Sequence, residues 1–534
     1  ASQDVINTGN IHGEKQVNIN VGRDINVGAH VNRLQHHDIV GRQGTIGVGE
    51  KGDLVLSAKR DVNLKGAIVY TGDNSKATIE AGQNINLTTE ALSAKKDMTV
   101  NSENYNRTDR RTELGTAILS DSNVNLHAGN DVNIRNGIVN SEHGVTSVEA
   151  GNDVTITNGQ SYSRDEYGLK YKEKSLLSRT TNIIRTDHER TGVLSSTIGG
   201  DTINVKANRN VSVTGSNILG TKDVSVSAGN DVRTDSGEET QRDDVYQYSK
   251  KSGLMGAGIG FTIGSKKVTD TTDGRYKNQV ATNISSSKDE INVSAGNSIH
   301  STTTNYFSNK PIDLSAQNVT VDGKHNTAHV VQSHEEKRSG LTVSVGGQIV
   351  NELNAVQQLG KRANSRKNSN LSTLEYLEAA NTLKHAYNDA KAYSKIKPVN
   401  LLDKEREVLS KANELNKSYQ LEHPEIENAV HPDVQNAIDK EQKYKHERAR
   451  KDSLLNINVS IGSSKFKQRN ELNEEQYIGS SLASKTKVDI LANSNDMSKG
   501  NIHITGSTVE APVVNVNASN ILRMDAGTNT IVQH

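Results

Sequence analysis

The chain has 534 residues, of which 32% are hydrophobic and 3% aromatic, and it contains no Trp or Cys. This length exceeds one ordinary hydrophobic core, so several domains or a repeat array are expected. Lys+Arg and Asp+Glu are both 63, so no basic excess points to a nucleic-acid partner. The lack of Cys excludes disulfides, zinc–thiolate sites and cysteine nucleophiles. No run approaches the ~20 apolar residues of a transmembrane helix.

A heptapeptide of the form A-G-N-D-V-x-I recurs along the chain. Its clearest copies are Ala128–Ile134 and Ala150–Ile156. Several neighbouring copies lie 21–23 residues apart. Gly-Asn-Asp is expected to form a turn, because these residue types tolerate positive φ. The Val-x-Ile part is expected to form a strand whose side chains alternate inward and outward. Variant copies begin at Ala58, Ala81, Ala207, Ala228, Ala295 and Ala316.

The repeat predicts a mainly β fold, a right-handed parallel β-helix. One unit cannot bury its apolar face alone, but stacked units pair each strand with its equivalent in the next coil. Val and Ile columns, including Val132, are expected inside, with Asn ladders between coils. A dozen or so coils would make a rod about 60 Å long at the usual strand spacing. Disorder, which a mean hydropathy of −0.67 would permit, is disfavoured by this periodicity. An antiparallel sandwich would need turns every ~8–12 residues instead.

Excursions interrupt the repeat. The sequences at which the excursions leave the repeat resemble each other, and so do the sequences at which they return. The number of residues between departure and return differs, which predicts protruding β-hairpins of variable length on one side of the rod. The return phrases are 115–131, 195–210, 284–297 and 478–496. The departure phrases, rich in charge and in Tyr or His, are 161–175, 240–254 and 332–341.

Residues 348–452 have a helical period. Ser372 and Glu375 form a capping box, and Pro398 separates two apolar-faced helical segments. The alternating strands 341–346 and 455–462 flank this part, so we expect an α-helical insertion on a two-stranded stalk.

Four regions follow from these patterns. They are β-helix repeats over 1–160, repeats with hairpin excursions over 161–347, the α-helical insertion over 348–452, and a returning hairpin strand with C-terminal coils over 453–534. Ala1 opens directly into repeat-like sequence without the features of a signal peptide, so we expect an excerpt of a longer protein.

No motif carries catalytic, cofactor-binding or metal chemistry, so we predict no such residues, no cofactor and no enzyme activity. Gly253–Lys267 is glycine-rich but matches neither phosphate-binding fingerprint. The pair His36-His37 lacks a nearby ligand set, and a solvated loop is expected there. Calcium binding by the Gly-Asn-Asp turns is an alternative, but calcium β-rolls repeat every nine residues and this period is ~21, so backbone turns are expected. The basic run Lys443–Lys451 is expected at a helix C-terminus, where cations complement the dipole.

Residues 1–347 and 453–534 resemble the second filamentous-haemagglutinin-type repeat region of two-partner-secretion exoproteins. The A-G-N-D-V repeats and the matching excursions carry this resemblance, which is nearest to the large effectors of contact-dependent growth inhibition in Gram-negative bacteria. It implies export by an outer-membrane transporter partner, passage through the periplasm, and a secreted or cell-surface location. It also implies toxin delivery across the outer membrane of a target cell, through that membrane or a surface receptor. The toxin domain is expected in cis, outside these residues.

Two other functions stay open. The same repeat supports adhesins that bind host or bacterial surfaces, and fold alone does not decide between them. A β-helical polysaccharide-degrading enzyme would need clustered carboxylates and stacking aromatics, whereas aromatic residues are 3% of this chain.

Three hairpin segments combine little charge with an apolar face: 254–264, 341–346 and 454–462. Membrane strands need ~9–11 residues of this kind. Isolated hairpins are marginally stable in water, which leaves two hypotheses. The hairpins pair into a closed sheet in a target membrane, or they pack laterally on the rod.

Overall fold

The computed structural model describes residues 3–175, 178–256, 260–346, 456–496 and 498–533. These residues form strands and connecting turns, and none of them lies in a helix. Correspondingly, the described part of the chain has no helix that is long and apolar enough to cross a membrane. The predicted α-helical insertion at 348–452 falls outside the described residues.

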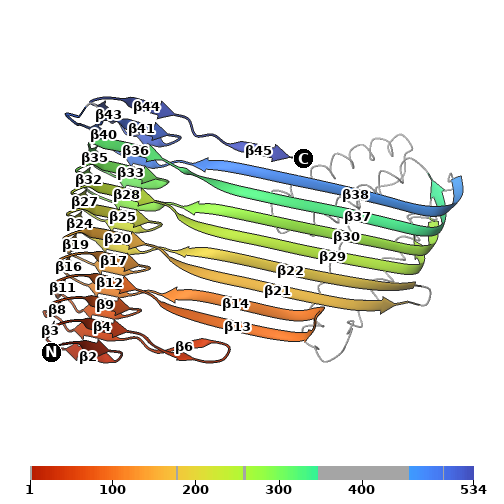
Figure 1. The fold of residues 1–534 in the computed structure, drawn as a ribbon, viewed down its shortest axis with the longest axis horizontal. Helices are drawn as coiled ribbons and strands as arrows, with labels where there is room; N and C mark the ends of the chain where they lie inside the picture. Colours follow the sequence, from red (N-terminus) through yellow and green to blue (C-terminus); the bar gives the residue numbers. More distant parts are fainter. Residues whose placement is uncertain (1–2, 176–177, 257–259, 347–455, 497, 534) are drawn as a thin grey trace.

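The chain winds through three parallel sheets, A, B and C, visiting C, A and B in turn (Figure 1). Sheet A has 12 strands, which confirms the expected number of coils. They are β1 (Val5–Asn7), β4 (Ile25–Gly28), β9 (Val62–Lys65), β12 (Ile85–Thr88), β17 (Val132–Arg135), β20 (Asp153–Thr157), β25 (Asn210–Thr214), β28 (Asp231–Asp235), β33 (Ser298–Thr302), β36 (Asn318–Asp322), β41 (Ile502–Thr505) and β44 (Leu522–Asp525).

Sheets B and C complete each coil. Sheet B contains β2 (Asn10–Gly13), β7 (Thr45–Val48), β10 (Ile68–Thr71), β15 (Ala117–Ser120), β18 (Ile138–Ser141), β23 (Thr197–Gly200), β26 (Asn217–Gly220), β31 (Thr282–Ser286), β34 (Thr304–Ser308), β39 (Ser481–Ser484) and β42 (Thr508–Glu510). Sheet C contains β3 (Gln16–Val21), β8 (Asp53–Ala58), β11 (Lys76–Ala81), β16 (Val124–Ala128), β19 (Val145–Ala150), β24 (Thr202–Ala207), β27 (Val224–Ala228), β32 (Ile291–Ala295), β35 (Ile312–Ala316), β40 (Lys487–Ala492) and β43 (Val513–Ala518).

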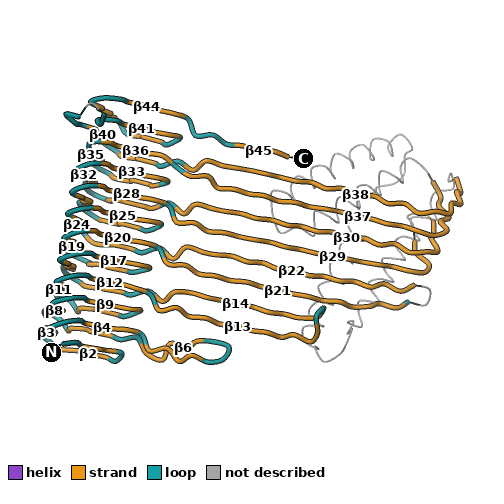
Figure 2. The backbone as a smooth tube through the Cα atoms, in the orientation of Figure 1, coloured by secondary structure: helices purple, strands orange, loops and turns teal. Residues whose placement is uncertain are grey.

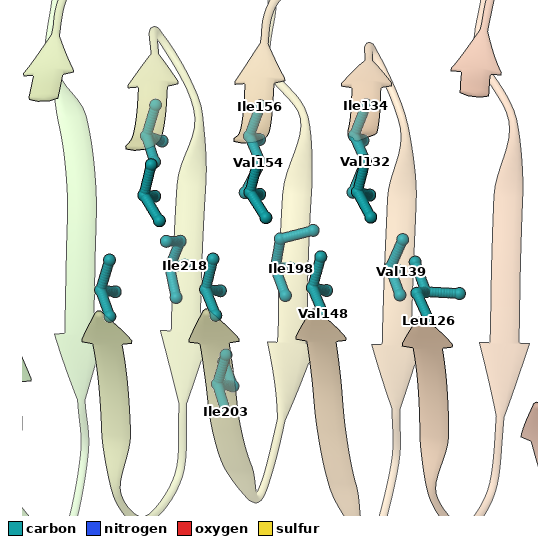
Figure 3. Packing of buried hydrophobic residues seen from close by; sticks show 14 of the residues in the cluster. Leu126, Val132, Ile134, Val139, Val148, Val154, Ile156, Ile198, Ile203 and Ile218 are labelled. Atoms are coloured by element: carbon teal, nitrogen blue, oxygen red, sulfur yellow. The ribbon is translucent and has the colours of Figure 1, made fainter. Parts of the chain in front are cut away.

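The core is a set of columns of aliphatic side chains between these sheets (Figure 3). Val132 pairs with Val154, and Val154 with Val211, and all three are fully buried. Every repeat copy found in the sequence contributes to the same columns, so the predicted phase is confirmed. The antiparallel sandwich is excluded by the parallel pairing.

The glycine of the repeat has a different role from the one expected. Gly82, Gly129 and Gly151 do not have positive φ. They stack on one another instead: a Cβ added at Gly129 would lie 2.3 Å from the carbonyl oxygen of Gly82, and one at Gly151 would lie 2.1 Å from that of Gly129. The expectation of positive φ was wrong, because this turn requires close approach between coils rather than an unusual backbone conformation.

The polar residues of the repeat form hydrogen-bonded ladders, as predicted. The Nδ2 of Asn86 donates to Oδ1 of Asn63 at 2.8 Å, and Asn133 donates to Asn86 at 3.0 Å. In the turn, Oδ1 of Asp131 accepts the backbone N–H of Asp153 at 3.1 Å, one coil away. The Asp and Asn of the turn thus satisfy backbone and amide donors of neighbouring coils.

A fourth sheet extends from one side of the rod (Figure 2). It is antiparallel with nine strands, and hairpins that the sequence suggested as separate excursions are hydrogen-bonded to each other. Its strands are β13 (Glu90–Asn101), β14 (Asn104–Leu114), β21 (Gly159–Lys174), β22 (Ser178–Leu194), β29 (Gly237–Gly256), β30 (Gly260–Val280), β37 (Lys324–Gly346), β38 (Asn456–Ile478) and β45 (Thr530–Gln533). The premise of isolated hairpins was therefore wrong.

Hairpins leave the corner between sheets A and B in alternate coils. They follow β12, β20, β28 and β36, and a short hairpin, β5 (His30–Arg33) with β6 (Asp38–Arg42), follows β4. The intervening corners, after β9, β17, β25, β33 and β41, are tight. Each contains one residue with φ between 46° and 60°: Gly66, Asn136, Gly215, Thr303 and Gly506. Because a hairpin occupies two strand widths, alternate coils space the hairpins for continuous pairing.

We predict that Gly129→Ala destabilises the rod by about 1–3 kcal/mol, because the added methyl group meets the backbone of Gly82. Gly28→Ala is the matched control, since its Cβ would have its nearest neighbour at 3.6 Å. Thermal unfolding should show a lower midpoint for the first variant and a small change for the second. Equal midpoints would contradict the stacking role of the glycine.

Two carboxylates, those of Asp313 and Asp489, face each other between adjacent coils of the rod. They lie opposite each other on β35 and β40, and Asp489 also accepts from Lys487 at 2.5 Å. Burial, followed by the interaction with Asp489, raises the pKa of Asp313 to about 6 from 3.8. A carboxyl whose pKa is higher in the folded state stabilises the fold at low pH and loses that contribution as pH rises through 4–6.

Asp313→Asn should therefore raise the unfolding midpoint at pH 7.5 and leave it nearly unchanged at pH 4. Unfolding curves over this pH range test it. A variant that is less stable at pH 7.5 would show that the two carboxylates do not oppose each other.

Candidate functional site

The antiparallel sheet is anchored to the rod by buried hydroxyl groups where each hairpin returns. The Oγ of Ser196 donates to the carbonyl of Thr157 at 2.7 Å, at the departure of the same hairpin, and accepts the N–H of Gly137 at 3.0 Å. The equivalent hydroxyls belong to Thr116, Thr282 and Ser480. Each ties the base of a hairpin to neighbouring coils, which fixes where the sheet leaves the rod.

One face of the sheet carries paired charges close to the rod. A row of four acidic side chains crosses four adjacent strands: Glu166, Asp187, Asp244 and Asp273. Arginines from the next row on this face neutralise it. Arg164 binds Asp187 through two hydrogen bonds of 2.9 and 2.7 Å, and Arg242 pairs with Asp244 at 2.5 Å.

Buried side chains lie on the other face. Tyr171 and Val330 are 8% and 2% exposed. Burial raises the pKa of Tyr167 to about 12 and also raises the pKa of the Glu173 carboxyl. Ion pairs on this face include His188–Asp243 at 2.7 Å and His334–Asp270 at 2.5 Å. The two faces of the sheet therefore differ in character.

The end of the sheet farthest from the rod is uncharged. Four glycines from β29, β30, β37 and β38 lie side by side there: Gly253, Gly264, Gly340 and Gly462. Beyond this glycine row, Ile263 is 52% and Ile461 84% exposed. Leu341 pairs with both of these isoleucines across its two neighbouring strands. This uncharged end begins where the charged part of the sheet stops.

The sequence-predicted hairpin segments lie in this region. Residues 341–346 pair with 456–461, as expected, but 341–344 also pair with β30. These strands therefore belong to the larger sheet, and the expectation of a separate two-stranded stalk was wrong. Segment 254–264 contributes to β29 and β30, and the glycine-rich stretch is paired strand at both ends. Residues 257–259 and 454–455 fall outside the described residues, as does the basic run 443–451.

In the described part of the chain, the candidate metal ligands lie in bends and turns between strands. His36 and His37 lie in the turn between β5 and β6, and both are exposed, as expected of a loop. Among the described residues, one other group could offer three ligands: Asp121, Glu142 and His143. Asp121 accepts from His143 at 2.9 Å, which raises the pKa of the imidazole, and from the N–H of Asn74 at 2.7 Å. These contacts describe a hydrogen-bonded corner of the rod.

Sequence reasoning missed two features of this sheet. The hairpin β13–β14 has a departure that was not recognised, although its return phrase was. The pairing of successive hairpins was also missed, and the signal for it was the occurrence of excursions in every second repeat.

This chain matches one repeat family in part and has sequence similarity to several known proteins. The hemagglutinin repeat family matches residues 178–272 and 441–534. The chain is 31% identical over 378 residues to a tRNA nuclease CdiA of Escherichia coli (strain STEC_O31), which covers 66% of this chain and 11% of that protein. It is 24% identical over 502 residues to tRNA nuclease CdiA-2 of Burkholderia pseudomallei (strain 1026b), covering 92% and 14%. No solved structure matches the chain.

The matched relatives are much longer than this chain. A tRNA nuclease CdiA of Burkholderia pseudomallei is 27% identical over 349 residues, and this alignment spans 64% of the chain and 27% of the relative. The chain thus corresponds to a minor part of each of these three proteins.

Proposed function

Because this chain is a filamentous haemagglutinin repeat region similar to that of CdiA toxins, we propose that it is the delivery region of a secreted bacterial exoprotein. In this proposal it carries a toxin across the outer membrane of a target bacterium during contact-dependent growth inhibition. An outer-membrane transporter partner exports it, and it acts at the cell surface. The toxin domain belongs to the same polypeptide, outside these residues.

The region itself is proposed to be non-catalytic. The carboxylates that the repeat supplies are engaged in the fold: Asp131, Asp153 and Asp231 each accept a backbone N–H from the neighbouring coil. A glycosidase-like centre instead requires two carboxylates free to act on a bond between sugars. The nuclease activities in the names of the relatives are therefore assigned to other parts of those proteins.

The observation that carries the proposal is the uncharged end of the antiparallel sheet. Ile263 and Ile461 are exposed there. The strand of Ile263, β30, is paired on both sides, and β38 at Ile461 is paired with β37 on one side. A bilayer rejects unpaired backbone, so in this proposal the open edge of β38 has to pair with further strands before the end of the sheet enters hydrocarbon. The uncharged runs Ser339–Gly346 and Asn456–Ser464 approach the ~9–11 residues that a membrane strand needs. We propose that this end of the sheet engages the target membrane.

The test is a double variant, Ile263→Lys with Ile461→Lys, in the full-length exoprotein. Two charges on the apolar surface should disfavour contact with hydrocarbon by about 2–4 kcal/mol each at membrane depth. Export and attachment to target cells should survive, while inhibition of target growth in co-culture should fall at least tenfold.

The matched control is Ile138→Lys with Leu219→Lys, which adds the same charges to exposed positions on sheet B of the rod. It should deliver like the parent protein. If the variant with Ile263→Lys and Ile461→Lys is exported normally and inhibits target cells as well as the parent does, this end of the sheet has no role in delivery. Loss of attachment together with inhibition would instead favour an adhesin.

A further inference from the structure

Four lysines face each other across adjacent strands near the free end of the sheet. Lys250 lies opposite Lys267, Lys267 opposite Lys337, and Lys337 opposite Lys465. We call these four residues the lysine row. Lys250, Lys337 and Lys465 are exposed, and Lys267 is partly exposed.

The lysine row is poorly neutralised compared with the acidic row closer to the rod. Two rows flank the lysine row on the same face of the sheet. The described residues of these three rows include one carboxylate near the four lysines, that of Glu335. Its Oε1 lies 2.6 Å from Nζ of Lys337 and 3.9 Å from Nζ of Lys465. Lys267 lies over the ring of Tyr248, with Nζ 5.2 Å from the centroid. The acidic row, by contrast, has an arginine beside most of its carboxylates.

Like charges placed directly opposite each other weaken a sheet. Four consecutive lysines in one row are therefore unfavourable for the fold by itself, and a locally unfavourable arrangement of this kind points to a function. An anionic partner would relieve the repulsion. The row runs straight across the strands, so the partner must present several negative charges along a line or over a surface.

The position of the row identifies the partner. Three rows separate the lysine row from the uncharged end. The first, on the opposite face, consists of Lys251, Lys266, Arg338 and Ser464; the second is the serines Ser252, Ser265, Ser339 and Ser463; the third is the glycine row. When an apolar segment contacts a bilayer, flanking lysines reach the headgroup level, where lipid phosphates lie. We propose that the lysine row binds phosphate groups of the target membrane's lipid headgroups, and so holds the uncharged end against the bilayer. This inference rests on the proposed function.

Vesicle binding by the intact chain tests it. Vesicles of phosphatidylcholine with added phosphatidylglycerol should bind the parent chain more tightly than vesicles of phosphatidylcholine alone. The variant with all four lysines of the row changed to Gln should bind the anionic vesicles at least a hundredfold more weakly, since each lysine near such a surface contributes about fivefold. Binding of the parent should also weaken steeply with salt.

A charge-matched control removes four lysines from the rod: Lys59→Gln, Lys206→Gln, Lys288→Gln and Lys310→Gln, all at exposed positions. It should bind within about twofold of the parent. The lysine-row variant should unfold at the same temperature as the parent or higher, because the repulsion is gone. A lower midpoint would contradict the unfavourable arrangement from which the inference starts.

Three results of the binding measurements would also overturn the inference: unchanged binding by the lysine-row variant, equal losses in both quadruple variants, or equally tight binding of the parent to soluble dextran sulfate. None of them bears on the uncharged end. The delivery assay with Ile263 and Ile461 variants therefore judges the proposed function separately.

Discussion

The spacing of hydrogen-bonded strands is the constraint on which this structure depends. Each coil of the rod advances by one strand width, and each hairpin occupies two. Hairpins inserted in every second coil therefore meet edge to edge, as β22 meets β29 and β30 meets β37. In the intervening coils a single residue in the left-handed region, such as Gly66 or Asn136, turns the corner. The rod acts as a template that sets the register of a sheet which hairpins alone would not form.

This arrangement separates the repeated contacts of the rod from the varied surface of the sheet. The buried columns and the Asn and Asp ladders belong to the rod, where every coil repeats the same contacts. In the described part of the chain the antiparallel sheet is a single layer of strands, and its character changes along its length. Compensated charges lie near the rod, poorly compensated lysines lie farther out, and an uncharged segment lies at the end. Such a gradient suits a surface that meets water, headgroups and hydrocarbon in turn.

Much of the rod could be predicted from the sequence, since the repeat encodes its own register. Val132, the ladders and the hairpin positions follow from periodicity, and the structure confirms them. The role of Gly129 could not be predicted in this way. The composition of a turn does not reveal whether its glycine is required for a positive φ or for close contact with the backbone of the next coil. The pairing of distant strands was also missed: Lys250 and Lys337 are 87 residues apart, and no local pattern shows that a third lysine links them. The lysines that flank the uncharged segments could be seen in the sequence. Their alignment in one row across four strands could be seen only in the structure.

The most direct test of the account is a disulfide between hairpins that are distant in sequence. Thr191 on β22 and Thr240 on β29 have hydroxyls 2.7 Å apart, and the chain has no other cysteine to interfere. Thr191→Cys with Thr240→Cys should cross-link under mild oxidation, whereas Thr191→Cys with Lys277→Cys, one strand farther, should not. Quantitative cross-linking of the first pair alone is the result that this structure predicts. Equal, slow cross-linking of both pairs would contradict a continuous sheet and leave the hairpins independent.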